Sequence, residues 1–125
     1  MVFLDANILL EIILKNRTKM VKVESYLSSV NEPTAISMLS AHLIMYFGRK
    51  EKAENEFLEG VIEENELLAL LPEDYEWAIK NEKRKDFEDA LQLSIATRSG
   101  CNTFVTLDNN LAKSYIDLPI NIISI

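Results

Sequence analysis

Short apolar runs alternate with longer segments of helical periodicity, and this alternation limits the fold more than any other feature of the chain. Five short runs are rich in apolar side chains, as buried strands are: residues 2–4, 34–37, 67–71, 103–106 and 120–123. Strands that alternate with helices usually pair in parallel, because a helix is the common connection between parallel strands. We therefore expect an α/β three-layer sandwich with a parallel central sheet of about five strands.

The segments between these runs predict helices. Seven are expected, at residues 6–14, 18–29, 38–47, 51–65, 73–82, 86–99 and 109–114. Gly48 and Gly100 stand where they would end two of these helices, since glycine is common just after the last helical residue. Pro72 cuts off the apolar run at 67–71, which we interpret as a buried strand.

Size and composition suit one domain without a membrane segment. A chain of 125 residues with 48% hydrophobic content can bury one core, so we expect residues 1–125 to form a single domain. No stretch approaches the roughly 18 uninterrupted apolar residues of a membrane span, and Asp5 interrupts the run that a secretory signal would need. We expect a cytoplasmic protein. The single cysteine, Cys101, and the single histidine, His42, exclude an internal disulfide and a Cys/His zinc cluster.

The net charge of −7, from 20 acidic and 13 basic residues, argues against a broad basic surface for nonspecific nucleic-acid binding. It does not exclude a metal-dependent nuclease, because carboxylates recruit cations that reverse the local field felt by a phosphate. Basic residues gather at 49–52 and 80–85. Each group is either a solvated helix face or a rim that steers phosphate towards a site.

Aspartates follow two of the expected strands. Asp5 comes directly after VFL, and Asp108 lies two residues after TFVT. Because the carboxyl ends of parallel strands meet at one edge of a sheet, both side chains should emerge there. Asp5 also suits a helix cap, since ANILLEIIL follows it, and the recurrence of an acid at the same edge favours a shared site.

Two further aspartates open the helix expected at 86–99. Asp86 and Asp89 are three residues apart and so share a helix face, and they also resemble a capping arrangement. We interpret Asp86 as the cap and Asp89 as the partner of Asp5 and Asp108 in an acidic site.

Three carboxylates from separate segments suit a hard divalent cation, Mg²⁺ or Mn²⁺, which prefers oxygen ligands. Such an ion lowers the pKa of a bound water and stabilises the charge that grows on a phosphodiester during in-line attack. Two ions about 4 Å apart would stabilise both the entering and the leaving oxygens, so the number of ions stays open. Without a cation the carboxylates repel one another, and the site should be strained or partly protonated.

Four segments together resemble the successive motifs of the PIN-domain nucleases: FLDANILLE, TAISMLSAHLIMYFG, DFEDALQLSIA and TFVTLDNNLAK. The resemblance is to the VapC-like toxins of toxin–antitoxin pairs in particular. It implies a five-stranded parallel sheet, an Mg²⁺- or Mn²⁺-dependent endoribonuclease acting on RNA, a homodimer, and a cognate antitoxin that inserts a basic side chain into the acidic pocket. By this resemblance Asp5, Asp89 and Asp108 are the catalytic, metal-binding acids, and Ser37 is a small hydroxyl residue near the first of them.

The second motif departs from the family. AHLI places His42 where the family usually has a glutamate. A neutral imidazole adds no negative charge and suits Mn²⁺ better than Mg²⁺. Three outcomes are open: His42 binds the ion or its water, or lines the site without binding, or marks a PIN domain that no longer cleaves and instead binds RNA or a protein partner.

Asparagines beside two of the acids have a structural and a functional interpretation. Asn7 either hydrogen-bonds Asp5 or a phosphate, or helps to start the first helix. Asn110, like Asn109 before it, either orients a water or forms a turn or cap. A haloacid-dehalogenase phosphatase is a weak alternative, because that class places a second aspartate where Asn7 stands.

Overall fold

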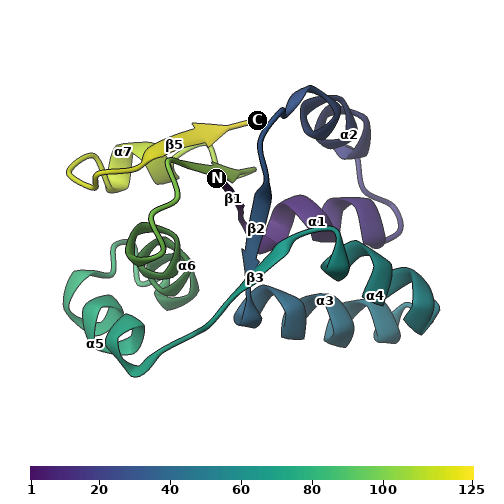
Figure 1. The fold of residues 1–125 in the computed structure, drawn as a ribbon, viewed down its shortest axis with the longest axis horizontal. Coiled ribbons are helices and arrows are strands. Elements are labelled where there is room, and N and C mark those ends of the chain that lie inside the picture. The colour runs from purple at the N-terminus through teal and green to yellow at the C-terminus, as the bar shows by residue number, and fades with distance from the viewer.

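The computed structural model describes residues 1–125 as a five-stranded parallel sheet with helices on both faces (Figure 1). The elements, in chain order, are β1 (Val2–Leu4), α1 (Ala6–Ile13), α2 (Met20–Ser29), β2 (Thr34–Ser37), α3 (Met38–Lys50), α4 (Asn55–Glu63), β3 (Glu66–Leu68), α5 (Pro72–Asn81), α6 (Phe87–Arg98), β4 (Thr103–Thr106), α7 (Leu111–Ser114) and β5 (Asn121–Ser124). The expected α/β architecture with a parallel sheet is confirmed. None of the helices is both long and apolar enough to cross a bilayer.

The strand order in the sheet is β3-β2-β1-β4-β5, and every neighbouring pair is parallel. From β1 the chain builds outward through β2 and β3, and it then crosses back to add β4 and β5 on the other side. β1 and β4 are therefore neighbours at the point where the winding reverses. Ligands of such sheets bind beyond the carboxyl ends of those two strands, which here are Leu4 and Thr106.

Alternate residues of β1 pack into two separate cores. Val2 and Leu4 face the side covered by α1, α2, α3 and α4, whereas Phe3 faces the side covered by α6 and α7 (Figure 1). Phe3 stacks on Phe104 of β4 with the ring centroids 5.2 Å apart. Both faces of the central strands are therefore buried, as the run VFL predicts for a parallel sheet.

Gly48 does not end the third helix, as the sequence suggested, but lies inside α3, which continues to Lys50. A Cβ at this position would lie 2.5 Å from Cδ2 of Leu58 on α4. Glycine is therefore needed here for the close approach of α3 and α4. The next helix also begins later than predicted, at Asn55, because a turn with Lys52 at φ 61° separates it from α3.

The run at 67–71 is not a buried strand. The strand comprises only Glu66–Leu68, and these side chains are exposed or half-buried, with Leu67 44% exposed. β3 pairs only with β2 and so lies at one edge of the sheet. Apolar content alone does not distinguish an edge strand from a central one.

Candidate active site

Asp5 lies at the carboxyl end of β1 and is 3% exposed. Its Oδ1 accepts a hydrogen bond from the backbone N–H of Ala6 at 2.8 Å, so the residue does cap α1. Its Oδ2 accepts a hydrogen bond from Oγ1 of Thr106 at 2.8 Å. The pKa of Asp5 is raised to about 6, chiefly by burial; the Thr106 hydrogen bond acts in the opposite direction, and the charge of Glu88 in the same direction as burial. Asp5 is thus both the N-cap of α1 and a buried acid whose pKa lies closer to neutral pH than that of an ordinary aspartate.

Thr106, the last residue of β4, connects the acidic residues, and sequence reasoning did not single it out. The buried hydroxyl donates to Asp5, accepts from Nδ2 of Asn7 at 3.2 Å and accepts from the backbone N–H of Asp108 at 3.1 Å. Oδ1 of Asn7 accepts from the backbone N–H of Leu107 at 3.2 Å. Asn7 therefore joins α1 to the end of β4 through Thr106 rather than by contacting Asp5. The only sequence signal was a hydroxyl residue two positions before Asp108.

Asp89 is held in the first turn of α6 by the cap of that helix. The carboxylate of Asp86 accepts from the backbone N–H of Asp89 at 3.1 Å, as the capping interpretation predicted. Burial raises the pKa of Asp89 to about 8, and the negative charges of Asp5, Asp86 and Asp108 add to this shift. Asp89 therefore lies at the start of α6, while Thr106 joins Asp5 at the end of β1 to the backbone of Asp108 beyond β4.

Arg84, in the loop before α6, makes ion pairs with two of these acids. Its Nη2 lies 2.7 Å from Oδ2 of Asp108 and 3.3 Å from Oδ2 of Asp89. The guanidinium lowers the pKa of Asp108, and the backbone N–H of Asn110, which donates to Asp108 Oδ1 at 2.9 Å, lowers it further. Asn110 therefore contributes its backbone N–H to the site. The sequence placed Arg84 only within a basic cluster, with no role of its own.

Glu88 adds another carboxylate that sequence reasoning did not single out. Its charge raises the pKa of Asp5, and its own pKa is raised by burial and by the charge of Asp86. We call Asp5, Asp86, Glu88, Asp89 and Asp108 the acidic cluster; it contains two carboxyl groups besides those of Asp5, Asp89 and Asp108.

Ser37 has no hydrogen bond to the acidic cluster and instead joins α3 to α6. It is the N-cap of α3, where its Oγ accepts from the backbone N–H of Ser40 at 3.0 Å and donates to Oε1 of Gln92 at 2.6 Å. Nε2 of Gln92 donates to Oγ of Ser40 at 2.9 Å, and all three residues are buried. Gln92 lies three residues after Asp89 on α6, so this network fixes the helix that carries Asp89.

His42 lies on the exposed face of α3. It lines a surface hollow with Met45, Tyr46, Arg49 and Lys50, and its ring centroid is 6.3 Å from that of Tyr46. No hydrogen bond or ion pair joins His42 to the acidic cluster. Its proposed place beside an ion remains a prediction.

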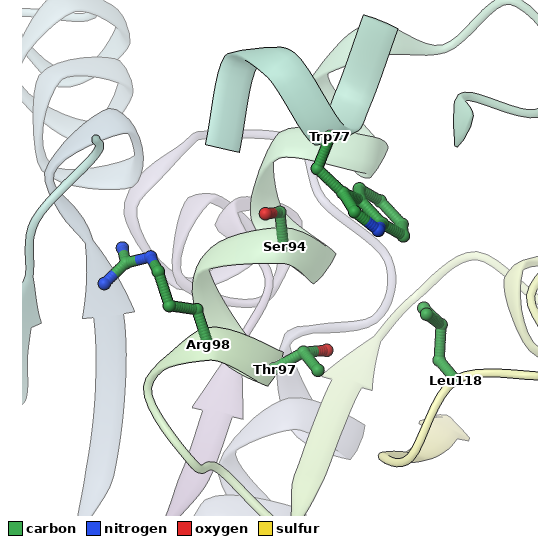
Figure 2. Close-up of a pocket in the computed structure, with 5 residues that line it drawn as sticks. All are labelled: Trp77, Ser94, Thr97, Arg98 and Leu118. Atoms are coloured by element: carbon green, nitrogen blue, oxygen red, sulfur yellow. The ribbon is translucent and has the colours of Figure 1, made fainter. Parts of the chain in front are cut away.

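Figure 2 shows a different pocket, of about 180 Å³, beside α6. Trp77 and Leu118 lie on one side of α6, and Arg98 extends towards the other. Arg98 and Ser94 both bind the fully buried carboxylate of Asp74, with Arg98 Nη2 2.9 Å and Ser94 Oγ 2.8 Å from its oxygens. These polar groups join α5 to α6, and none of the predicted site residues lines this pocket.

The carboxylate oxygens of the acidic cluster are the donors that Mg²⁺ and Mn²⁺ prefer, so the chemistry of the residues fits such an ion. No group of three or more His, Cys, Asp or Glu side chains is already arranged around a common point that could hold a metal ion. The positive charge of Arg84 lies against the carboxylates of Asp89 and Asp108.

A parallel sheet with an acidic cluster beyond β1 and β4 defines a PIN-like α/β protein. A family model described as a PIN domain matches residues 1–110, and the chain belongs to this family. No curated protein matches the sequence closely.

Solved toxin structures share the fold at low sequence identity. A toxin–antitoxin complex from Klebsiella pneumoniae has a TM-score of 0.77 at 17% identity, covering 99% of this chain and 97% of that one. VapC20 from Mycobacterium tuberculosis, a sarcin–ricin loop cleaving toxin, has a TM-score of 0.74 at 10% identity, and the match covers 92% of this chain and 95% of that one. VapBC2 from Rickettsia felis, bound to promoter DNA, has a TM-score of 0.62 at 17% identity, and the match covers 100% of this chain and 99% of that one.

Proposed function

We propose that residues 1–125 form a single PIN domain that acts as a metal-dependent endoribonuclease and as the toxin of a type II toxin–antitoxin pair in the cytoplasm. Membership of the PIN family and the toxins among the structural neighbours support this function. The observation that carries the proposal is a set of contacts beyond the two strands where the winding reverses: Thr106 joins Asp5 to Asp108, and Arg84 joins Asp108 to Asp89.

In this proposal Asp5, Asp89 and Asp108 hold Mg²⁺ or Mn²⁺ through their oxygens. When bound, the ion activates a water and stabilises the charge that develops on the scissile phosphate of RNA. Thr106 orients Asp5 by donating to Oδ2, and Asp86 fixes the backbone that carries Asp89. Burial and the neighbouring carboxylates raise the pKa of Asp89, so a cation bound at this carboxylate would compete with a proton.

A cognate antitoxin is the proposed protein partner. Arg84 already lies against Asp89 and Asp108, so the acidic cluster accommodates a guanidinium. A basic side chain from an antitoxin would make the same charge-assisted contacts and exclude the metal. A homodimer, formed through the early helices, is part of the same proposal.

Cleavage of RNA by purified protein in Mn²⁺ or Mg²⁺ tests the proposed activity. Asp5→Asn and Asp89→Asn are expected to lose cleavage and to relieve growth arrest on expression. Asp117→Asn removes an exposed carboxylate outside the acidic cluster and should retain both properties. Full cleavage and toxicity in either cluster variant would refute the assignment.

A PIN-fold binding module is the second candidate function. One observation favours it: His42, which by the resemblance stands where the family usually has an acid, lines an exposed hollow on α3. Because His42 lines this hollow, His42→Glu should leave Mg²⁺-supported cleavage unchanged, and increased cleavage would instead indicate that this position lies beside the ion. Absence of Mn²⁺ binding by calorimetry at millimolar concentration would favour the module.

A further inference from the structure

The loop between α5 and α6 places a positive charge among the proposed metal ligands. Nη2 of Arg84 lies 2.7 Å from Asp108 and 3.3 Å from Asp89, and Nη1 lies 3.4 Å from the second oxygen of Asp108. The Arg84 side chain is 36% exposed, whereas those of Asp89 and Asp108 are 14% and 30% exposed. The guanidinium therefore contacts both carboxylates from the most exposed side chain of the three.

The backbone of this loop keeps Arg84 in place. Arg84 and Lys85 have φ angles of 57° and 54°, so two successive residues without glycine's freedom adopt the left-handed conformation. Contacts hold the loop on both sides. The backbone N–H of Lys83 donates to the hydroxyl of Tyr115 at 2.8 Å, and Asp86 caps α6. An unfavourable backbone held at both ends indicates that the tertiary structure determines the position of Arg84.

A divalent cation and Arg84 need the same oxygens. Oδ2 of Asp89 and Oδ2 of Asp108 are the atoms closest to the guanidinium, and they are also donors that an ion would use. A dication between these acids would be repelled by a guanidinium at the same position. The two cations therefore exclude each other, and the partly exposed arginine can turn into solvent while the capped and hydrogen-bonded acids stay in place.

We infer that Arg84 is an internal counter-cation that competes with the divalent ion for Asp89 and Asp108 and keeps the metal-free site closed. The inference rests on the proposed function only in taking these acids as metal ligands. Arg84 is a positioning residue in this scheme, because it sets how readily the ion enters and does not itself act on RNA. Metal concentration then controls whether the site is open.

Calorimetric titration with Mn²⁺ alone, without RNA, tests this inference. Arg84→Gln is expected to bind Mn²⁺ at least about 10-fold more tightly than the wild type, because the ion no longer displaces a charge-assisted contact. Lys85→Gln is the matched control: it removes the same charge from the neighbouring residue, which has no ion pair, and should stay within about 2-fold of the wild type. Arg84→Lys retains the charge and should bind less tightly than Arg84→Gln.

Thermal unfolding of the same variants supplies a second measurement. Arg84→Gln should unfold at a lower temperature than the wild type in EDTA, because Asp89 and Asp108 lose their cation, and should gain more from Mn²⁺. Equal Mn²⁺ affinity in Arg84→Gln and wild type, together with weaker binding in Asp89→Asn, would overturn the inference and leave the proposed function intact. Absence of Mn²⁺ binding in both wild type and Arg84→Gln would overturn both.

Discussion

Replacing Asp5 by asparagine removes the most buried carboxylate of the acidic cluster while keeping the size of the side chain. The amide oxygen can still accept from the backbone N–H of Ala6, so the cap of α1 is retained. The hydroxyl of Thr106 loses its carboxylate acceptor, and it already accepts from Asn7 and from the backbone N–H of Asp108, so the new amide costs this hydrogen bond at every pH. The change that depends on pH is the loss of a buried group that would otherwise carry negative charge.

The expected magnitude follows from the pKa of Asp5, which the structure raises from 3.8 to about 6. The folded protein therefore binds this proton more tightly than the unfolded chain does. The stabilisation is fully present below pH 3.8 and is lost as the pH rises through about 6. This difference in pKa corresponds to about 3 kcal/mol of stabilisation in total, of which about 2 kcal/mol is lost between pH 4.5 and 8.

Urea denaturation in EDTA at pH 4.5, 6 and 8 measures this pH-dependent contribution of Asp5 to the free energy of unfolding. The free energy of unfolding of Asp5→Asn should gain about 2 kcal/mol relative to the wild type between pH 4.5 and 8. Asp117→Asn, an exposed control, should follow the wild type at each pH. Saturating Mn²⁺ at pH 8 should stabilise the wild type and leave Asp5→Asn unchanged. Identical pH dependence in Asp5→Asn and wild type would refute the reasoning about burial of this charge.

Three further predictions concern the cluster and the packing behind it. Because the pKa of Asp89 is about 8, Mn²⁺ must displace a proton, and its affinity should rise between pH 6 and 8.5. The heat of Mn²⁺ binding at pH 7 should then depend on the ionisation enthalpy of the buffer that takes up this proton. Equal heats in two buffers of different ionisation enthalpy would contradict proton release. Thr106→Val should lower the free energy of unfolding by about 1–3 kcal/mol and weaken Mn²⁺ binding, whereas Thr106→Ser should retain both, as urea denaturation and calorimetry can measure. Gly48→Ala should lower the free energy of unfolding, measured in urea, by about 1–3 kcal/mol, because its Cβ would meet Leu58 of α4. Gly60→Ala should raise it by about 0.5–1 kcal/mol, because the added Cβ meets nothing within 4 Å and alanine favours the helix.

Most elements of the fold were predictable because their signals are local. The runs at 2–4, 34–37 and 103–106 became strands with these bounds, and most helix ends lie within two residues of their predicted positions. The errors occurred where a long-range contact decided the outcome. Gly48 has the local signature of a helix end, but its contact with Leu58 keeps it inside α3.

The candidate site was predictable to the extent that its residues follow strands or open a helix. Asp5 and Asp108 were identified by their positions after strands, and Asp89 by its position in the first turn of a helix. Thr106 and Arg84 were not identified, because a threonine at a strand end and an arginine in a basic loop are ordinary in sequence. Each contacts an acid far away in the chain: Arg84 contacts Asp108, 24 positions away, and Thr106 contacts Asp5, 101 positions away.

The amino-acid sequence by itself determined the alternation of strands and helices, the parallel architecture, and the placement of three aspartates at element ends. Backbone propensity and side-chain periodicity act over a few neighbouring residues, so they can be read without coordinates. Only the tertiary structure decided the strand order, the exposure of β3, the raised pKa of Asp5 and Asp89, and the contact of Arg84 with two acids. These properties depend on burial and on charges at short distance through space, which arise only when distant segments pack together.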